Sequence, residues 1–274
     1  MHDYKKQHPT YKPYIRFCIF VTIGLMVFSS QLLAQETTKW NDFLYEQYFS
    51  GQTIIESDEI HQLVTPLRAE NGAIVPIKIQ ANIPQQPSLY IKKVTLIIDE
   101  NPVPWAGTFN FSPKIDRASL DLRLRLNAYS NIRAIAETNT GKLYMSKRFV
   151  KASGGCSAPL GTDIESAMLT LGKIRMRSKL IQDSSAQKIQ LAISHPNITG
   201  LQMDQFTRNY APAHFIKDIR VSYEGEEIFS AETDISISQN PNFKFYFIPK
   251  MKGDLTAEIT DSKGFKFSQI YTVQ

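Results

Sequence analysis

Hydrophobic and polar residues alternate along much of the chain beyond residue 74. In ASLDLRLRL, residues 118–126, leucines take every second position and charged residues fill the positions between them. Successive side chains of a β-strand point to opposite faces, so this period predicts strands with one buried and one polar face. No stretch after residue 51 keeps a helical period over three turns. The pattern therefore predicts an all-β protein.

Turn signals divide the predicted strands into two groups. About six short strands are expected between residues 74 and 152 and about seven more in the second half. NTGK, YEGEE and DSKGF are typical of hairpin turns, and Gly225 and Gly264 are available there for positive φ. Between the groups lies SGGCSAPLGTD, whose glycine and serine content is typical of a linker. We therefore expect two antiparallel β-sandwich domains joined by a Gly/Ser-rich linker.

The first 34 residues have the features of an export signal. A basic stretch ends at Arg16, an uncharged apolar run covers residues 17–28, and SSQLLA leads to Ala34. An uncleaved membrane anchor is the alternative, but a membrane span needs about 20 apolar residues and this run is shorter. We expect cleavage after Ala34 and no stable membrane association afterwards. Behind the signal, the aromatic spacing in KWNDFLYEQYFSG predicts a short helix that ends at Gly51.

Composition and charge exclude some functions. Apolar residues make up 42% and charged residues 21%, which is ordinary for a globular protein. The signal holds four basic residues and one acidic residue, so it carries +3 of the net charge of +5 and leaves +2 on the rest. A nearly neutral body gives no reason to expect nucleic acid.

Motifs for self-contained chemistry are missing from the sequence. GxSxG, HExxH and phosphate-loop patterns do not occur. His195 and His214 could be combined with Cys156 as metal ligands, but their spacing matches no zinc pattern. We expect no metal, no cofactor and no catalytic residues.

The cysteines carry the chemistry that the sequence does suggest. Cys18 leaves with the signal, so Cys156 remains alone in a compartment that is expected to be oxidising. Gly154 and Gly155 precede it and give the backbone freedom to swing. The sequence therefore predicts an exposed thiol on a flexible arm, able to attack oxidised sulfur and to hold an adduct. The alternative is an incidental buried cysteine where two domains meet.

Longer stretches resemble a known family. YIKKVTLIIDENPVP, GTFNFSP and RLRLNAYSNIRAIAETNTGKLYMSKRFVKASGGC resemble the SoxY subunit of the SoxYZ sulfur carrier, over Ile74–Cys156. SHPNITG, APAHFIKDIRVSYEGEEIFSAETDISISQNPNFKFYF and KGDLTAEITDSKG resemble its SoxZ subunit, over Ile174–Gln274. The arrangement is similar to fused SoxYZ-like carriers associated with quinoprotein dehydrogenases. Taken together with the export signal and the predicted helix, the resemblance divides the chain into four parts. Residues 1–34 are the signal peptide, residues 35–152 a SoxY-like sandwich with a short N-terminal helix, residues 153–164 the Gly-Gly-Cys arm, and residues 165–274 a SoxZ-like sandwich.

The resemblance also implies a function. It predicts two immunoglobulin-like sandwiches in the periplasm and a cysteine, Cys156, that holds sulfur intermediates of thiosulfate oxidation while partner enzymes act on them. The partners would be enzymes of sulfur oxidation or a quinoprotein dehydrogenase system, and the protein itself would be a carrier and not an enzyme. The family's GGCGG ending is not kept, because Ser157 and Ala158 follow the cysteine and Pro159 stiffens the exit. The alternatives are a tandem immunoglobulin-like binding or adhesion module with an inert cysteine, and a thiol enzyme with a histidine beside Cys156.

Overall fold

The computed structural model describes residues 39–159, 168–182, 184–204 and 207–273. The predicted export signal lies outside the described residues. The chain divides into two units, residues 1–50 and residues 51–274. In the part of the chain that is described, no helix combines the length and apolar character that a membrane crossing requires.

The described part of the first unit is the predicted short helix. A π-helical turn, η1 (Trp40–Leu44), runs directly into α2 (Tyr45–Phe49). The ring of Trp40 packs within this segment against Tyr45 and Phe49, at centroid distances of 6.1 and 6.0 Å. Gly51 follows with φ of 70°, the left-handed conformation that commonly ends a helix. The expectation of a short helix is confirmed.

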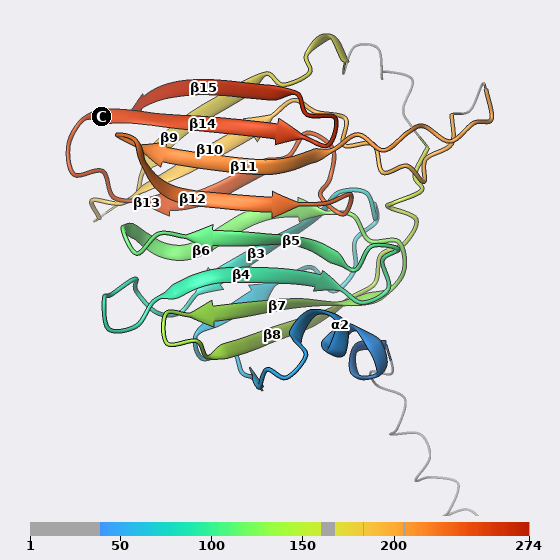
Figure 1. Cartoon of the computed structure of the whole chain (residues 1–274), viewed down its shortest axis with the longest axis horizontal. Helices are drawn as coiled ribbons and strands as arrows, with labels where there is room; N and C mark the ends of the chain where they lie inside the picture. Colours follow the sequence, from blue (N-terminus) through green and yellow to red (C-terminus); the bar gives the residue numbers. More distant parts are fainter. Residues whose placement is uncertain (1–38, 160–167, 183, 205–206, 274) are drawn as a thin grey trace, which may run out of the picture. The chain divides into compact units, whose positions relative to one another are not determined.

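The second unit consists of two β-sheets (Figure 1). The larger sheet has the strand order β1 (Ile54–Glu56), β8 (Leu143–Val150), β7 (Ser130–Thr138), β4 (Ile91–Ile98), β5 (Trp105–Phe111), β12 (Glu226–Thr233), β11 (Ile216–Tyr223), β14 (Gly253–Asp261) and β15 (Lys266–Val273). The smaller sheet has the order β2 (His61–Val64), β3 (Val75–Ala81), β6 (Ile115–Leu124), β13 (Asn242–Phe247), β10 (Gln187–Ile193) and β9 (Ile174–Leu180). Neighbouring strands are antiparallel except for β1 and β8. The all-β prediction is confirmed.

Both sheets run without a break through the two halves of the chain. In the larger sheet β5 pairs with β12, where Phe111 lies opposite Phe229, and in the smaller sheet β6 pairs with β13, where Leu120 lies opposite Phe245. Figure 1 shows the green strands of the first half continuing into the orange strands of the second. The expectation of two separate sandwiches joined only by a linker is therefore corrected. Alternation identifies the buried face of a strand but not its neighbour, and pairing between the halves satisfies strand edges that would otherwise be open.

The core between the sheets is also shared by both halves. Phe243 and Phe245 of β13 are buried, as the alternation in NFKFYF predicts, and lie against Phe109 of β5 and Phe229 of β12 at centroid distances of 6.2 and 5.0 Å. Burying each such side chain contributes about 2 kcal/mol. Apolar contact and strand pairing thus join the halves independently of the segment that links them in sequence.

Candidate functional site

The predicted site residue lies in a turn after β8. Gly155, Cys156 and Ser157 form this turn, and Cys156 is completely buried. Ser157 is exposed, as is Gly154. The turn therefore lies at the surface while its cysteine is sheltered from solvent.

Backbone contacts with the first half hold the turn in place. The Gly154 N–H donates to the Asn127 carbonyl at 2.9 Å, and the Gly155 N–H donates to the Leu126 carbonyl at 2.8 Å. A Cβ at Gly155 would lie 2.0 Å from the carbonyl oxygen of Gly72, so only glycine fits there. Gly154 has φ of 71° with open space where a Cβ would point. The two glycines thus serve different needs: Gly155 permits a close backbone approach, and Gly154 a left-handed conformation.

A loop of the second half fastens the same turn from the other side. The Thr199 hydroxyl donates to the Cys156 carbonyl at 2.7 Å, and the Gln202 amide donates to the Ala158 carbonyl at 3.0 Å. The Thr199 N–H donates to the Gln202 side-chain oxygen at 3.1 Å, which fixes the two donors relative to each other. We call Thr199 and Gln202 the clamp. It satisfies carbonyl groups that closure of the turn takes out of water.

A buried arginine lies beside the turn, since the carbonyl of the next residue, Leu126, accepts from the Gly155 N–H. Arg125, which follows β6, is 1% exposed, and its Nη1 donates to the Asn197 carbonyl at 2.6 Å and to the Ile237 carbonyl at 2.9 Å. Burial raises the pKa of the Cys156 thiol to about 11, although the positive charge of Arg125 opposes the rise. Burial also lowers the pKa of Arg125 to about 10, which leaves it protonated at neutral pH. Because the thiolate is the nucleophile, the thiol in this closed position is unreactive.

The two halves of this site match two protein families. A family profile described as sulfur oxidation protein SoxY matches residues 45–156, and one described as sulphur oxidation protein SoxZ matches residues 174–272. The chain is a fusion of a SoxY domain and a SoxZ domain in one polypeptide. Proteins of these families are carriers of the periplasmic Sox sulfur oxidation system and are not enzymes. We call residues 45–156 the SoxY domain and residues 174–272 the SoxZ domain.

Other comparisons add nothing to this assignment. No curated protein matches the chain in sequence. Among solved structures, the superoxide reductase (neelaredoxin) from Ignicoccus hospitalis is 15% identical with a TM-score of 0.31, covering 34% of this chain and 80% of that chain. The superoxide reductase from Nanoarchaeum equitans is 16% identical with a TM-score of 0.29, covering 37% of this chain and 92% of that chain.

The structure corrects the predicted state of the arm. The sequence predicts an exposed thiol with Gly154 and Gly155 as flexible residues, whereas Cys156 is buried and both glycine N–H groups are hydrogen-bonded. The reason is that the SoxY domain supplies carbonyl groups and the SoxZ domain supplies the clamp, and neither contact is visible in the local sequence. The role of Cys156 as the attachment residue remains a prediction.

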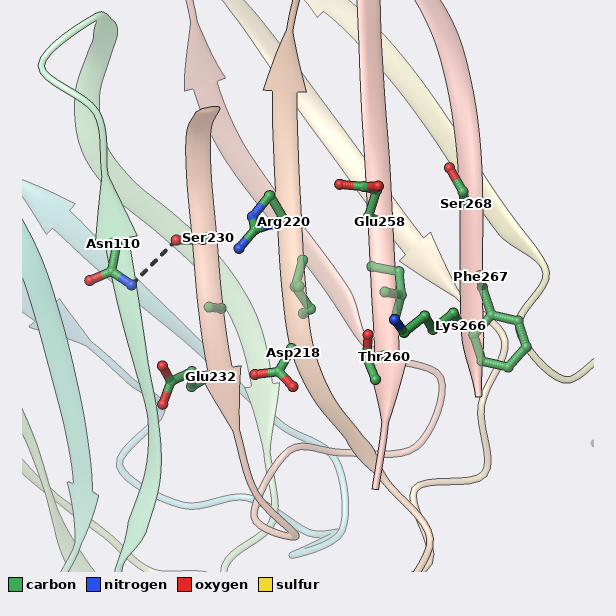
Figure 2. Close-up of a pocket in the computed structure, with 13 residues that line it drawn as sticks. Asn110, Asp218, Arg220, Ser230, Glu232, Glu258, Thr260, Lys266, Phe267 and Ser268 are labelled. Carbon is green, nitrogen blue, oxygen red and sulfur yellow. Dashed lines mark hydrogen bonds between the residues drawn. The ribbon is translucent and has the colours of Figure 1, made fainter. Parts of the chain in front are cut away.

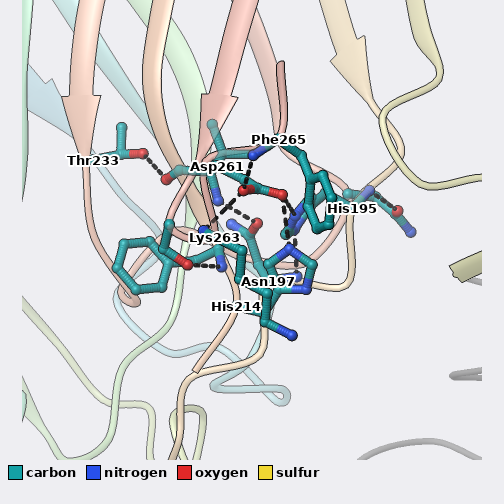
Figure 3. A network of polar contacts seen from close by, with 11 residues as sticks. His195, Asn197, His214, Thr233, Asp261, Lys263 and Phe265 are labelled. Carbon is teal, nitrogen blue, oxygen red and sulfur yellow. Dashed lines mark hydrogen bonds and ion pairs between the residues drawn. The ribbon is translucent and has the colours of Figure 1, made fainter. Parts of the chain in front are cut away.

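The sequence did not reveal a polar cluster in the SoxZ domain. His195, His214 and Asp261 are buried together, with potential ligand atoms within 4.8 Å of one another (Figure 3). His214 Nε2 lies 2.7 Å from Asp261 Oδ2 and His195 Nε2 lies 3.6 Å from it. These three residues lie too far apart in the sequence to form a local motif, and the sequence alone combines His195 and His214 with Cys156 rather than with Asp261.

The hydrogen bonds of this cluster assign its protons. The Asn197 N–H donates to His195 Nδ1 at 3.0 Å, so the proton of the neutral His195 ring is on Nε2, facing the Asp261 carboxylate. Burial lowers the pKa of His195 to about 4. A metal would need the Nε2 lone pair that this proton occupies. The cluster is best suited to holding the SoxZ loop that carries the clamp, because Asn197 also accepts the hydrogen bond from Arg125.

Among the described residues, neither His61 nor a charged hollow on the larger sheet adds a catalytic site. His61 Nε2 contacts the Ala134 carbonyl at 2.9 Å and not the cysteine. A hollow of about 450 Å³ on the larger sheet is lined by mixed charges, including Asp218, Arg220 and Glu258 (Figure 2). Its side chains come from the polar faces of strands and converge on no single group, as the alternation of those strands predicts.

Proposed function

We propose that this protein carries a sulfur intermediate covalently on Cys156 and presents it to enzymes of periplasmic sulfur oxidation. One observation supports this best: the SoxY match ends at Cys156, and the SoxZ domain clamps the turn that holds this residue. A carrier needs a thiol that is sheltered in transit and accessible to partners. A turn held at the surface by a few hydrogen bonds meets both needs.

The chemistry follows from opening of the turn. In the closed position the thiol is neutral, with its pKa raised to about 11 by burial. Once the turn swings out, the sulfur regains the pKa of a solvated thiol, about 8.5, and forms thiolate at neutral pH more readily. The thiolate attacks an oxidised sulfur atom, a new S–S bond forms, and the leaving group departs with the electron pair of the broken bond.

The finer parts of the proposal concern cargo and partner. Sulfane or sulfonate groups derived from thiosulfate are the proposed cargo, and a quinoprotein dehydrogenase system is the more specific proposed partner. Both follow from the resemblance of the fused arrangement to such carriers.

One observation favours a second function. The complete burial of Cys156, with its raised pKa, is also what an inert cysteine in a binding or adhesion module would show. In that case the surfaces of the fused sheets would bind the partner, and the thiol would serve only as a buried packing group.

Labelling and mass spectrometry separate these functions. The full chain is isolated from the periplasm of a thiosulfate-oxidising host, and its intact mass is compared with that of the Cys156→Ser variant. We expect mass increments of sulfur or sulfonate on the peptide containing Cys156, and maleimide labelling of the folded protein at a measurable rate. A Cys156→Ser chain that supports thiosulfate oxidation fully, or a thiol that reacts only after global unfolding, would refute the carrier function.

A further inference from the structure

Two arginines of the SoxY domain are buried to the same extent but differ in their partners. Arg125 and Arg133 are each 1% exposed. Arg133 forms a bidentate ion pair with Asp99, with N–O distances of 2.8 to 3.1 Å. Arg125 has no carboxylate among the ion pairs of the described residues, and its Nε lacks any hydrogen-bond acceptor there. Its two hydrogen bonds go to backbone carbonyls.

An unpaired buried cation of this kind is costly. Taking a charge out of water costs several kcal/mol unless an opposite charge or hydrogen bonds replace the water. The two carbonyl groups replace part of the lost hydration of Arg125, but its Nε–H donor has no acceptor among the described residues. A buried donor without an acceptor lowers the stability of the fold. A bound ion is one explanation for such a group in a native fold. The Arg133–Asp99 pair shows how this fold completes a buried guanidinium for structural purposes.

The anion missing from Arg125 has a candidate source in the same site. Hydrogen bonds place Arg125 beside Cys156: the carbonyl of Leu126, the next residue after Arg125, accepts from the Gly155 N–H, and the loop whose Asn197 carbonyl accepts from Arg125 also bonds the Cys156 carbonyl through Thr199. In the closed turn the thiol of Cys156 is neutral. A sulfur adduct changes this. Both proposed cargo classes end in an anion: a sulfane ends in –S–S⁻ and a sulfonate ends in –SO₃⁻. Each is a better partner for a guanidinium than a neutral thiol.

We propose that Arg125 binds the terminal anion of a sulfur adduct on Cys156 while the turn is closed. This inference rests on the proposed carrier function and names the class of cargo that the site retains. Anionic adducts are held inside and shielded from reductants, whereas neutral adducts are held no better than the free thiol. Selection thus acts on the charge of the cargo and not on its exact chemistry.

Two reagents load the cysteine with adducts that differ in charge. Tetrathionate gives Cys156–S–S–SO₃⁻: the thiolate attacks an inner sulfur, the central S–S bond breaks, thiosulfate leaves, and the thiol proton goes to solvent. Methyl methanethiosulfonate gives the neutral Cys156–S–S–CH₃ and releases methanesulfinate. In both reactions the cysteine sulfur is oxidised and the reagent is reduced, so no further oxidant is needed.

The test measures release of each adduct by dithiothreitol from the full chain, folded and in urea. The ratio of unfolded to folded rates gives a protection factor for each adduct. We expect the anionic adduct to be protected about tenfold more than the neutral one, the factor expected for one charge-assisted hydrogen bond. Arg125→Gln should abolish this difference and Arg125→Lys should restore part of it. Arg123→Gln, on the same segment with its guanidinium bonded to the Asn240 carbonyl, should leave it unchanged.

Each outcome decides between the two proposals. Equal protection of the two adducts in the unsubstituted protein overturns the role of Arg125, even if Arg125→Gln does not fold. If Cys156 is loaded but Arg125→Gln leaves the protection factors unchanged, the role of Arg125 is also overturned, while the carrier function stands. Failure of tetrathionate to load folded protein counts against the carrier function itself.

Discussion

Replacing Thr199 with Val should loosen the turn that shelters Cys156. The substitution keeps the β-branched shape but removes the hydroxyl that donates to the Cys156 carbonyl at 2.7 Å and accepts from the Leu201 N–H at 3.1 Å. Loss of one such bond costs about 1 kcal/mol, and about 2 kcal/mol if the carbonyl stays buried without a partner. The open population of the turn should therefore rise about 5- to 30-fold.

The assay is the rate at which folded protein reacts with a maleimide in excess at neutral pH. If the turn opens and closes faster than the thiol reacts, this rate equals the open fraction multiplied by the rate measured in urea. Thr233→Val is the matched control, because the Thr233 hydroxyl is also buried and donates to a carbonyl, that of Ile216, at 2.6 Å. It should lower the free energy of unfolding while leaving the labelling rate of folded protein near that of the unsubstituted chain.

Two results would refute this reasoning. Equal labelling of the Thr199→Val and unsubstituted proteins would mean that the clamp does not limit opening. Labelling that follows the free energy of global unfolding in both variants would mean that the turn does not open locally.

Three further predictions concern stability and packing. Asp99→Asn should lower the free energy of unfolding in urea by about 3–5 kcal/mol, because Arg133 would remain buried without its carboxylate. Burial lowers the pKa of His195 to about 4, so the unfolded chain takes up a proton at this residue before the folded chain does as pH falls below about 6.5. The free energy of unfolding therefore decreases between pH of about 6.5 and about 4. His195→Asn should reduce this decrease by up to about 3 kcal/mol when urea unfolding is measured against pH. Gly155→Ala should raise the rate of maleimide labelling far more than Gly154→Ala does. The Cβ added at Gly155 would collide with backbone atoms, whereas the Cβ added at Gly154 meets none and costs only about 1 kcal/mol of left-handed strain. Equal labelling of the two variants would contradict the closed turn.

Much of the fold could be read from single-strand patterns. Leu120, Leu122 and Leu124 alternate in sequence and are buried along β6, and Phe243 and Phe245 do the same along β13. The pairing of these two strands could not be read, because each pattern reports only which face is apolar. Whether the partner strand comes from the same half or the other half depends on the edges of both sheets, which local sequence does not describe.

The candidate site shows the same limit at the level of single residues. The sequence singles out Cys156 and its glycines correctly as an unusual segment, but treats the missing Cβ of Gly155 as freedom. In the fold that missing atom permits contact with the Gly72 carbonyl, so the same residue type restrains the turn. In the sequence Arg125 is likewise one more charged residue in an alternating strand. Its burial could not be predicted, because the SoxZ loop that contacts it is distant in the sequence.

The continuity of the sheets changes what the arm has to do. Since β5–β12 and β6–β13 join the halves, the turn can open without separating the SoxY and SoxZ domains. Opening breaks the two hydrogen bonds donated by the glycine N–H groups and the two hydrogen bonds of the clamp, and it exposes one small side chain. The open state therefore lies about 4–6 kcal/mol above the closed state in free energy. That cost corresponds to about one open molecule in 10³ to 2 × 10⁴. The population is small enough to protect a lone thiol in an oxidising compartment. A partner would have to bind the open turn about 10⁵-fold more tightly than the closed one to make the open form predominate over this whole range.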